Sequence, residues 1–413
     1  MRWCSLLTLA LALTLADKTE AAPPGLQGFI RVSNGSFVDE QCQEYLPFGW
    51  NRQEILWSAP WSVWVNLNEE AANAASSLTD DALDPSVQNH VVSLFQEANT
   101  CGFNVIRIFA HGQDVNHQLQ LAPGKYNESY FRGIDYILAV AGKHNVKYLS
   151  WAGIDPVYED TFWTSKKVRD MIKDHYTVLV NRRNVFTGKL YKDDDTIFAW
   201  DIYNEPRCPA SQIGTGCPAA ITAFYHDLSA YMKHVDPNHL VTTGEEGFFE
   251  LSGGDADADP SGIPENVRTT FKSCTTSTQS VVCTADEFVI EYNWETQDPM
   301  FPRTWIEAHE AASAAMGKPL VLEEFGKGKG KNVTYAAVYD TLQDSLLHNG
   351  SFKGALFWRW GEDGGAVDST DFNIVHTGDP TFQLILNASA NVKPFLGRMV
   401  PGCHPKPPVT AFG

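Results

Sequence analysis

The chain has 413 residues, 43% hydrophobic and 20% charged, which is enough for one large globular domain or two modest ones. Its formal net charge is -19 at pH 7, which argues against nucleic acid or an anionic membrane as the binding partner. The acidity is instead typical of a soluble protein whose ligand is neutral or cationic.

Residues 1–22 have the pattern of a secretory signal peptide, with a basic second residue, an apolar run over 6–15 and small residues up to Ala22. The apolar run is too short to span a bilayer, and no later segment reaches the roughly 20 apolar residues of a membrane helix. We therefore expect a secreted, extracellular protein that makes no membrane contact. Cleavage after Ala16 and cleavage near residues 21–22 both fit the pattern.

One of the eight cysteines, Cys4, lies in the signal peptide, so seven remain in the mature chain. The short spacings Cys208/Cys217 and Cys274/Cys283 predict two local disulfides in a secreted protein. One of the other three is expected to be unpaired, and their pairing is left open: Cys42, Cys101 and Cys403. Five Asn-x-Ser/Thr triplets also fit secretion, at Asn34, Asn127, Asn332, Asn349 and Asn387.

The first predicted element after the signal peptide is a β-hairpin. Strand-like residues 28–32 and 36–38 flank Asn34–Gly35, and Asn-Gly between two apolar runs is a strong two-residue turn signal. We expect this short N-terminal hairpin to plug or cap a larger fold.

Strand-like and helix-like segments then alternate. The predicted strands are 47–51, 105–109, 146–151, 197–204, 240–244, 287–292, 320–324 and 354–358. The predicted helices are 87–99, 130–144, 166–181, 219–234, 305–316 and 333–348. Eight such units predict an α/β fold, the (β/α)8 TIM barrel, over residues 23–400, followed by a Pro-rich tail at 401–413. A doubly wound open sheet is the competing fold, but no Gly-rich phosphate loop follows the first strand.

Two predicted strands end in a carboxylate. Pro206 has no N–H and cannot extend a central strand, so the fourth strand ends near Asn204–Glu205. The seventh strand ends at Glu324. Catalytic groups of such barrels lie at these C-terminal strand ends, and strands four and seven can face each other across the barrel mouth.

A pair of carboxylates across a cleft is the arrangement that glycosidic bond cleavage requires. One carboxyl must protonate the leaving oxygen, and the other must be ionised. At about 5–5.5 Å the ionised one attacks the sugar directly, whereas at about 6.5–9.5 Å it activates water. Metal binding is the alternative, but no His or third acid completes a metal-ligand pattern, so we expect no metal and no cofactor.

The chain resembles glycoside hydrolase family 5 of clan A, and within it the plant and fungal endo-β-1,4-mannanases, from about residue 28 to about residue 360. The motifs that carry the resemblance are 191–194, 204–208, 236–240, 247–249, 323–327 and 357–358. The resemblance implies that Glu205 is the acid/base and that Glu324 is the nucleophile. Glu323 is expected to point away from Glu324, because successive strand residues face opposite sides.

The resemblance also implies substrate-site roles for four further residues. Arg107 would hydrogen-bond the nucleophile and favour its ionised form, and Asn204 would contact the sugar 2-OH. Trp358 would form the stacking floor under the sugar, and Tyr292 would lie beside the nucleophile. For other aromatic residues, core and cleft positions are equally expected: Trp151, Trp163, Trp294 and Trp360. His111 is expected either to line the cleft or to be structural.

The sixth strand departs from the family pattern, which has His-x-Tyr-Pro at its end. Here Glu291–Tyr292 stands in its place and no His is present. This difference leaves substrate choice open.

The function expected from these residues is a secreted, endo-acting, retaining β-1,4-mannanase. Its partner would be a mannan-type polysaccharide rather than nucleic acid, and it would act as a monomer without a cofactor. A β-1,4-glucanase or a mannan transglycosylase is the enzymatic alternative. A carbohydrate-binding barrel without catalysis is the non-enzymatic one.

Overall fold

The computed structural model describes residues 27–52, 62–66, 93–94, 96–109, 119–137, 161–203, 217–244, 281–286, 300–327, 330–361 and 375–406. Several predictions lie outside these residues: the signal peptide and the strands at 146–151 and 287–292. One cysteine of each predicted local disulfide, Cys208 and Cys274, also lies outside them.

Eight strands close into a barrel in the order β10-β11-β12-β13-β4-β6-β5-β9. They are β4 (Phe48–Arg52), β5 (Ser62–Asn66), β6 (Val105–Phe109), β9 (Ile197–Asp201), β10 (Leu240–Thr242), β11 (Val281–Asp286), β12 (Leu320–Phe325) and β13 (Phe352–Phe357). The apolar runs at 105–109 and 197–204 predicted β6 and β9, and every residue of β9 is buried. Burial of a whole strand is typical of a sheet covered on both faces.

One barrel strand differs from the all-parallel prediction. β5 lies between β6 and β9 and pairs antiparallel with both. We expected a parallel strand at 146–151 in this place and predicted no strand at residues 62–66. The sequence Ser-Val-Trp-Val-Asn is rich in β-branched and aromatic residues, which favour a strand, and antiparallel pairing places it in the barrel without a crossover helix.

The sixth barrel strand is also displaced along the sequence. We predicted residues 287–292, whereas β11 is Val281–Asp286, with Asp286 in register with Glu324 of β12. The run 281–286 begins with two valines and has its own strand propensity. Local pattern therefore does not decide which of two adjacent runs pairs with β12.

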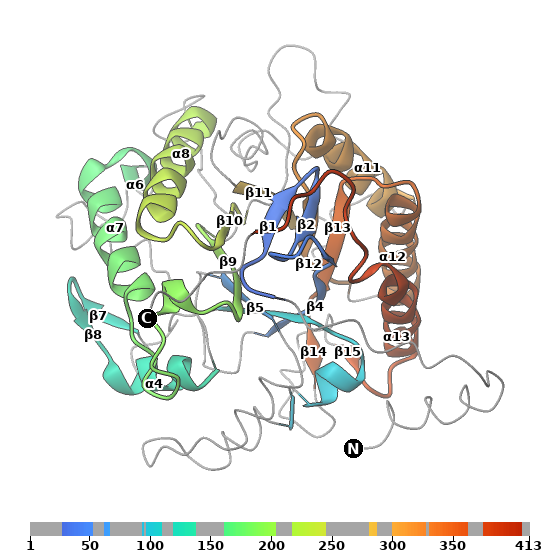
Figure 1. Ribbon diagram of the computed structural model, residues 1–413, viewed down its shortest axis with the longest axis horizontal. Helices are drawn as coiled ribbons and strands as arrows, with labels where there is room; N and C mark the ends of the chain where they lie inside the picture. The colour runs from blue at the N-terminus through green and yellow to red at the C-terminus, as the bar shows by residue number, and fades with distance from the viewer. Residues whose placement is uncertain are drawn as a thin grey trace.

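Helices lie around the barrel, with α7 and α8 on one side and α11, α12 and α13 on the other (Figure 1). They include α4 (Glu128–Ile137), α6 (Thr161–Thr164), α7 (Lys166–Val180), α8 (Cys217–Val235), α11 (Phe301–Ala314), α12 (Lys331–Leu347) and α13 (Pro380–Val392). Predictions for α7, α8, α11 and α12 are confirmed to within a few residues. The Ser165 hydroxyl caps α7 by accepting from the Val168 amide.

A small sheet of β1 (Arg31–Ser33), β2 (Ser36–Val38) and β3 (Glu44–Tyr45) covers one end of the barrel. β1 pairs antiparallel with β2 across Asn34 and Gly35, whose φ angles of 50° and 74° fit a type I′ turn. Phe37 and Tyr45 pack edge-on against Phe198 of β9, with ring centroids 5.2 and 5.1 Å apart. These contacts fill the end of the barrel at which β9 begins.

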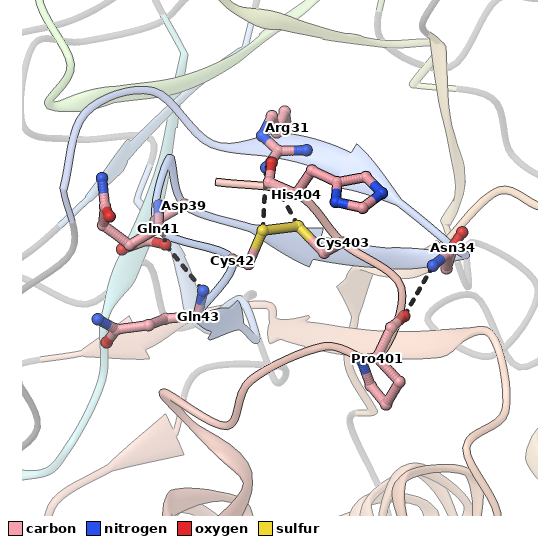
Figure 2. The surroundings of a disulfide bond; sticks show 9 residues. All are labelled: Arg31, Asn34, Asp39, Gln41, Cys42, Gln43, Pro401, Cys403 and His404. Atoms are coloured by element: carbon pink, nitrogen blue, oxygen red, sulfur yellow. Dashed lines mark hydrogen bonds between the residues drawn. A yellow bond between two sulfur atoms is a disulfide. The ribbon is translucent and has the colours of Figure 1, made fainter. Parts of the chain in front are cut away.

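The C-terminal segment is bonded to this small sheet. Cys42 and Cys403 form a disulfide that joins residues 361 positions apart. Arg31 lies beside both sulfur atoms and donates to the His404 carbonyl at 2.8 Å, and Asn34 donates to the Pro401 carbonyl (Figure 2). The start of the Pro-rich tail thus runs along the hairpin.

The expectation that one of Cys42, Cys101 and Cys403 is unpaired is wrong. Cys101 is disulfide-bonded as well, and its partner is neither of the other two because they bond to each other. The described fold also contains the short strands β7 (Gln120–Ala122), β8 (Lys125–Tyr126), β14 (Trp360–Gly361) and β15 (Val375–His376) and the short 3-10 helices η2 (Tyr191–Asp193) and η6 (Lys393–Phe395). Residues 93–94 and 96–100 are helical as well. In the described part of the chain, no helix combines the length and apolar character needed to cross a membrane.

Candidate active site

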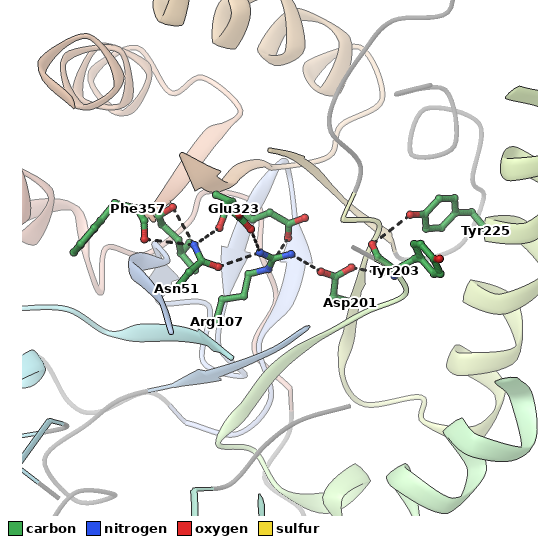
Figure 3. Close-up of polar contacts among 9 residues, drawn as sticks. Asn51, Arg107, Asp201, Tyr203, Tyr225, Glu323 and Phe357 are labelled. Carbon is green, nitrogen blue, oxygen red and sulfur yellow. Dashed lines mark hydrogen bonds and ion pairs between the residues drawn. The ribbon is translucent and has the colours of Figure 1, made fainter. Parts of the chain in front are cut away.

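Arg107 lies at the centre of the candidate site. It is the third residue of β6, its side chain is completely buried, and its guanidinium donates in two directions (Figure 3). Nη1 donates to Oε2 of Glu324 at 2.7 Å and to Oδ1 of Asn51 at 3.0 Å, while Nη2 donates to Oδ2 of Asp201 at 3.0 Å. The predicted contact between Arg107 and Glu324 is therefore present.

Glu323 also faces Arg107, which corrects the expectation that it points away from Glu324. Its Oε2 lies 3.7 Å from Nε of Arg107, and its side chain is fully buried. The reason is a β-bulge, because β12 has one residue more than either neighbour between Leu322 and Phe325. A bulge interrupts the strict alternation of side chains along a strand, so two successive glutamates reach one guanidinium.

The two glutamates differ in exposure. The side chain of Glu324 is 9% exposed and that of Glu323 is 0% exposed. A nucleophile must reach its substrate from within a largely dry site, so Glu324 is the better placed of the two. Glu323 instead is a second, fully buried carboxyl group beside Arg107.

Asn51 supports the bulge from β4, which is separated from β12 by β13 in the barrel. Its side-chain amide donates to the carbonyl of Glu323 at 2.8 Å and lies 3.4 and 3.5 Å from the carbonyls of Leu356 and Phe357. Its carbonyl oxygen accepts from Arg107. Asn51 therefore links its own strand β4 to β6, β12 and β13 beside Glu324. The sequence did not predict this role, although an amide at the end of an apolar strand was a signal for it.

Among the described residues, the guanidinium of Arg107 is shared by three carboxylates. Asp201, Glu323 and Glu324 all contact Arg107, and all are buried. Ionised groups at such depth are stable only when they are paired and hydrogen-bonded. The fixed, planar fork of arginine suits this task better than the point charge of lysine.

The other predicted catalytic residue is not among those described. β9 ends at Asp201, and the described chain continues only to Tyr203, directly before Asn204 and Glu205. Tyr292 and Glu291 also lie outside the described residues, as does His111. Their roles stay predictions, as does the separation between the two catalytic glutamates.

Trp358 directly follows β13 and is partly buried against the barrel core. Its amide donates to the Phe325 carbonyl at 2.6 Å, its carbonyl accepts from the Tyr335 hydroxyl at 3.1 Å, and its peptide bond to Arg359 is cis. The residue is thus held next to the strand that carries Glu324. Its stacking role stays a prediction.

Two of the four other tryptophans belong to the core. Trp163 packs 4.9 Å from the ring of Tyr203, and Trp360 packs between Trp50 and Phe382 at 5.3 and 5.5 Å. Both are at most 2% exposed. The other two, Trp151 and Trp294, lie outside the described residues.

Some of the motif residues that indicated the family serve the fold rather than the site. Asp236 accepts from Trp200 Nε1 at 2.7 Å and lies 2.6 Å from Nδ1 of His239, whose Nε2 lies 2.9 Å from the Asp194 carbonyl. Burial alone would raise the pKa of Asp236, but the hydrogen bonds from His239 and Trp200 outweigh it and lower the pKa. This cluster ties the beginnings of β9 and β10 together.

Within the described ranges, no group of three or more His, Cys, Asp or Glu side chains has the arrangement of a metal site. The three carboxylates around Arg107 share its guanidinium as an ion-pair partner. What the arrangement supplies is a carboxylate that a guanidinium holds in place near the C-terminal end of a barrel strand.

This chain is similar to known proteins in both sequence and fold. The family model described as "GH family 5 beta-mannosidase-like" matches residues 149–383, more than half of the chain. Mannan endo-1,4-beta-mannosidase 4 of Oryza sativa subsp. japonica is 32% identical over 323 residues, which are 70% of this chain and 69% of that protein. Mannan endo-1,4-beta-mannosidase 7 of Arabidopsis thaliana is 32% identical over 311 residues, or 67% and 70% of the two chains.

Among solved structures, the endo-1,4-beta-mannanase from Rhizomucor miehei has a TM-score of 0.67 at 22% identity, with 89% of this chain and 99% of that chain covered. The family 5 mannosidase from the same organism has a TM-score of 0.64 at 21% identity, with 89% and 98% covered. At 21% and 22% identity, these two structures support the fold alone. The family match and the identity to the plant relatives together show that the chain belongs to glycoside hydrolase family 5, in its β-mannosidase-like group.

Proposed function

We propose that this protein is a secreted, endo-acting, retaining β-1,4-mannanase that uses Glu205 as acid/base and Glu324 as nucleophile. The observation that carries the proposal is the buried hydrogen bond of 2.7 Å between Arg107 and Glu324 at the end of β12. The guanidinium holds the carboxylate ionised and aimed, as a nucleophile requires.

The mechanism follows from the chemistry of the two carboxyl groups. Glu205 protonates the glycosidic oxygen while Glu324 attacks the anomeric carbon, and a glycosyl-enzyme forms as the leaving sugar departs. Glu205 then takes a proton from water, which attacks the same carbon from the opposite face and releases Glu324. Trp358 supports the sugar ring, and Asn204 and Tyr292 contribute polar contacts beside it.

The names of the plant relatives support mannan as the substrate, since both act on mannan by their names. The Cys42–Cys403 disulfide supports secretion, because disulfides persist in oxidising compartments. The choice between mannan and glucan rests on the groups around the axial 2-OH of mannose, where the Glu291–Tyr292 sequence departs from the family.

The test is a reducing-end assay of the purified protein on mannan, glucomannan and cellulose, with Glu324→Ala as the inactive control. We expect mannan or glucomannan to be cut faster than cellulose by about tenfold or more, the range that a single contact to a substrate group can give. Faster cleavage of cellulose would contradict the substrate assignment.

Product analysis in the same assay distinguishes the remaining alternatives. An endo-acting hydrolase releases a range of short oligosaccharides from the start. Products longer than an added mannooligosaccharide would identify a transglycosylase. Binding of mannan without cleavage of any of the three polysaccharides would identify a carbohydrate-binding barrel.

A further inference from the structure

Asp201 is a buried carboxylate that the proposed mechanism does not use. It is the last residue of β9, follows four buried apolar residues, and is 1% exposed. Its two oxygens accept from two different donors, Oδ2 from Arg107 Nη2 at 3.0 Å and Oδ1 from the Tyr203 amide at 3.3 Å (Figure 3). A charged residue that closes an otherwise apolar strand requires a reason, because its burial is costly.

The surroundings allow the carboxylate little freedom. Gly244, just beyond β10, has a φ of 63°, and a Cβ at this position would lie 2.4 Å from Oδ1 of Asp201 and 2.0 Å from the Tyr203 carbonyl oxygen. Only a glycine permits this approach and this backbone conformation. The carboxylate of Asp201 is therefore enclosed between Arg107, the Tyr203 amide and the backbone of Gly244.

Tyr203 is anchored in turn. Its carbonyl accepts from the Tyr225 hydroxyl at 3.4 Å, and its ring packs among the aromatic side chains of α6 and α8, 4.9 Å from Trp163 and 5.9 Å from Phe224. The next two residues in the chain are Asn204 and Glu205. Asp201 thus contacts both the arginine that orients Glu324 and the backbone that leads to Glu205.

We propose that Asp201 is a positioning residue that sets the two catalytic glutamates relative to each other. One oxygen fixes the guanidinium of Arg107, and the other fixes the backbone amide two residues before Glu205. The proposal rests on the proposed function. A shift of about 1 Å between catalytic groups costs roughly 10²-fold in rate, so a link between the two sides of the site has a large effect on turnover.

The substitution that tests this role is Asp201→Asn. A carboxylate offers two acceptor oxygens, whereas an amide of the same shape has one acceptor and one donor. The variant can therefore accept a hydrogen bond from Arg107 or from the Tyr203 amide, but not from both. Asp201→Ala accepts neither hydrogen bond and is the stronger form of the same test.

Asp135→Asn is the matched control. Asp135, on α4, is also buried, and it accepts from Arg182 at 2.6 Å and from the Tyr191 hydroxyl at 2.7 Å. It lies among α4, α7 and η2, away from the residues of the site. Loss of its charge should lower stability without touching the catalytic groups.

The first measurement is kcat and KM on a mannooligosaccharide, normalised to folded protein. We expect Asp201→Asn to lower kcat roughly 10²-fold with KM nearly unchanged, because substrate binding is kept and the geometry of the reacting groups is lost. Asp135→Asn should retain kcat within about twofold, since it removes no interaction with the transition state. A loss in Asp201→Asn no larger than in Asp135→Asn would overturn the proposal.

A second measurement does not depend on activity. Denaturant midpoints are compared for Asp201→Asn, Glu324→Gln and the double variant, and for the same cycle with Asp135→Asn. Groups that share one partner couple, and distant groups are additive, so only the first cycle should deviate from additivity. Additive midpoints in the first cycle would overturn the link. If the first cycle shows coupling but the wild-type protein cuts no mannoside, the link between the two residues stands and the proposed function is overturned.

Discussion

Glu324→Ala is expected to lose at least about 10³-fold in kcat, as does an enzyme that loses one member of a catalytic unit. Without this carboxylate no glycosyl-enzyme can form. Glu205→Ala should lose roughly 10²–10⁴-fold on polysaccharide, because the leaving oxygen departs unprotonated. Both variants should remain folded, and Glu307→Ala, which removes an exposed surface acid, is the control.

Azide separates the two roles on an aryl β-mannoside with a good leaving group. In Glu324→Ala, azide can enter the space of the missing carboxylate and attack from its side, which gives the α-mannosyl azide. In Glu205→Ala, the glycosyl-enzyme still forms, and azide attacks it from the opposite face to give the β-mannosyl azide. Exchanged stereochemistry between the two variants would mean that the roles are reversed, and near-normal turnover in either would refute the assignment.

The second large effect is expected on stability. Arg107→Met removes the guanidinium and leaves the buried carboxylates of Asp201, Glu323 and Glu324 without their shared cation. Breaking a buried pair in this way costs about 3–5 kcal/mol in the free energy of unfolding. Denaturant unfolding measures this cost directly.

Arg303→Met is the control, because its ion pairs with Glu307 and Asp344 lie at the surface and such pairs contribute at most about 1 kcal/mol. Arg107→Lys keeps a charge but not the planar fork, so it should recover part of the stability and little of the activity. An Arg107→Met protein as stable as the wild type would show that the three carboxylates do not depend on the guanidinium.

The sequence predicted those parts of the fold that depend on local pattern. β6 was predicted at its observed bounds, and α7, α8, α11 and α12 were predicted to within a few residues, because apolar periodicity and strand propensity are local properties. The helix α13 was missed, although Asp379 caps it and Pro380 stands in its first turn. An Asp-Pro pair before an apolar run is a recognisable helix start.

The misses inside the barrel depend on pairing between distant strands. A bulge at Glu323 and Glu324 is visible only when β12 is compared with β11 and β13. For the same reason, the antiparallel position of β5 and the choice of residues 281–286 as the sixth strand lie beyond local pattern. The Cys42–Cys403 bond joins the two ends of the described chain, and cysteine spacing does not determine such a pairing.

In the site, the residue types indicated the chemistry, and the structure added the supporting groups. The contact between Arg107 and Glu324 followed from the family resemblance and is present. Asn51 and Asp201 were not predicted, because each acts through Arg107 rather than on a sugar. A buried polar residue in an apolar strand is the signal that would have found both.

The measurement that tests the central claim most directly is the configuration of the first product. Proton NMR of a fresh digest of a mannooligosaccharide distinguishes the α and β anomers of the new reducing end before they equilibrate. Two displacements at the same carbon, the first by Glu324, predict that the β anomer appears first. The α anomer appearing first would contradict a nucleophilic Glu324 and would require water to attack directly.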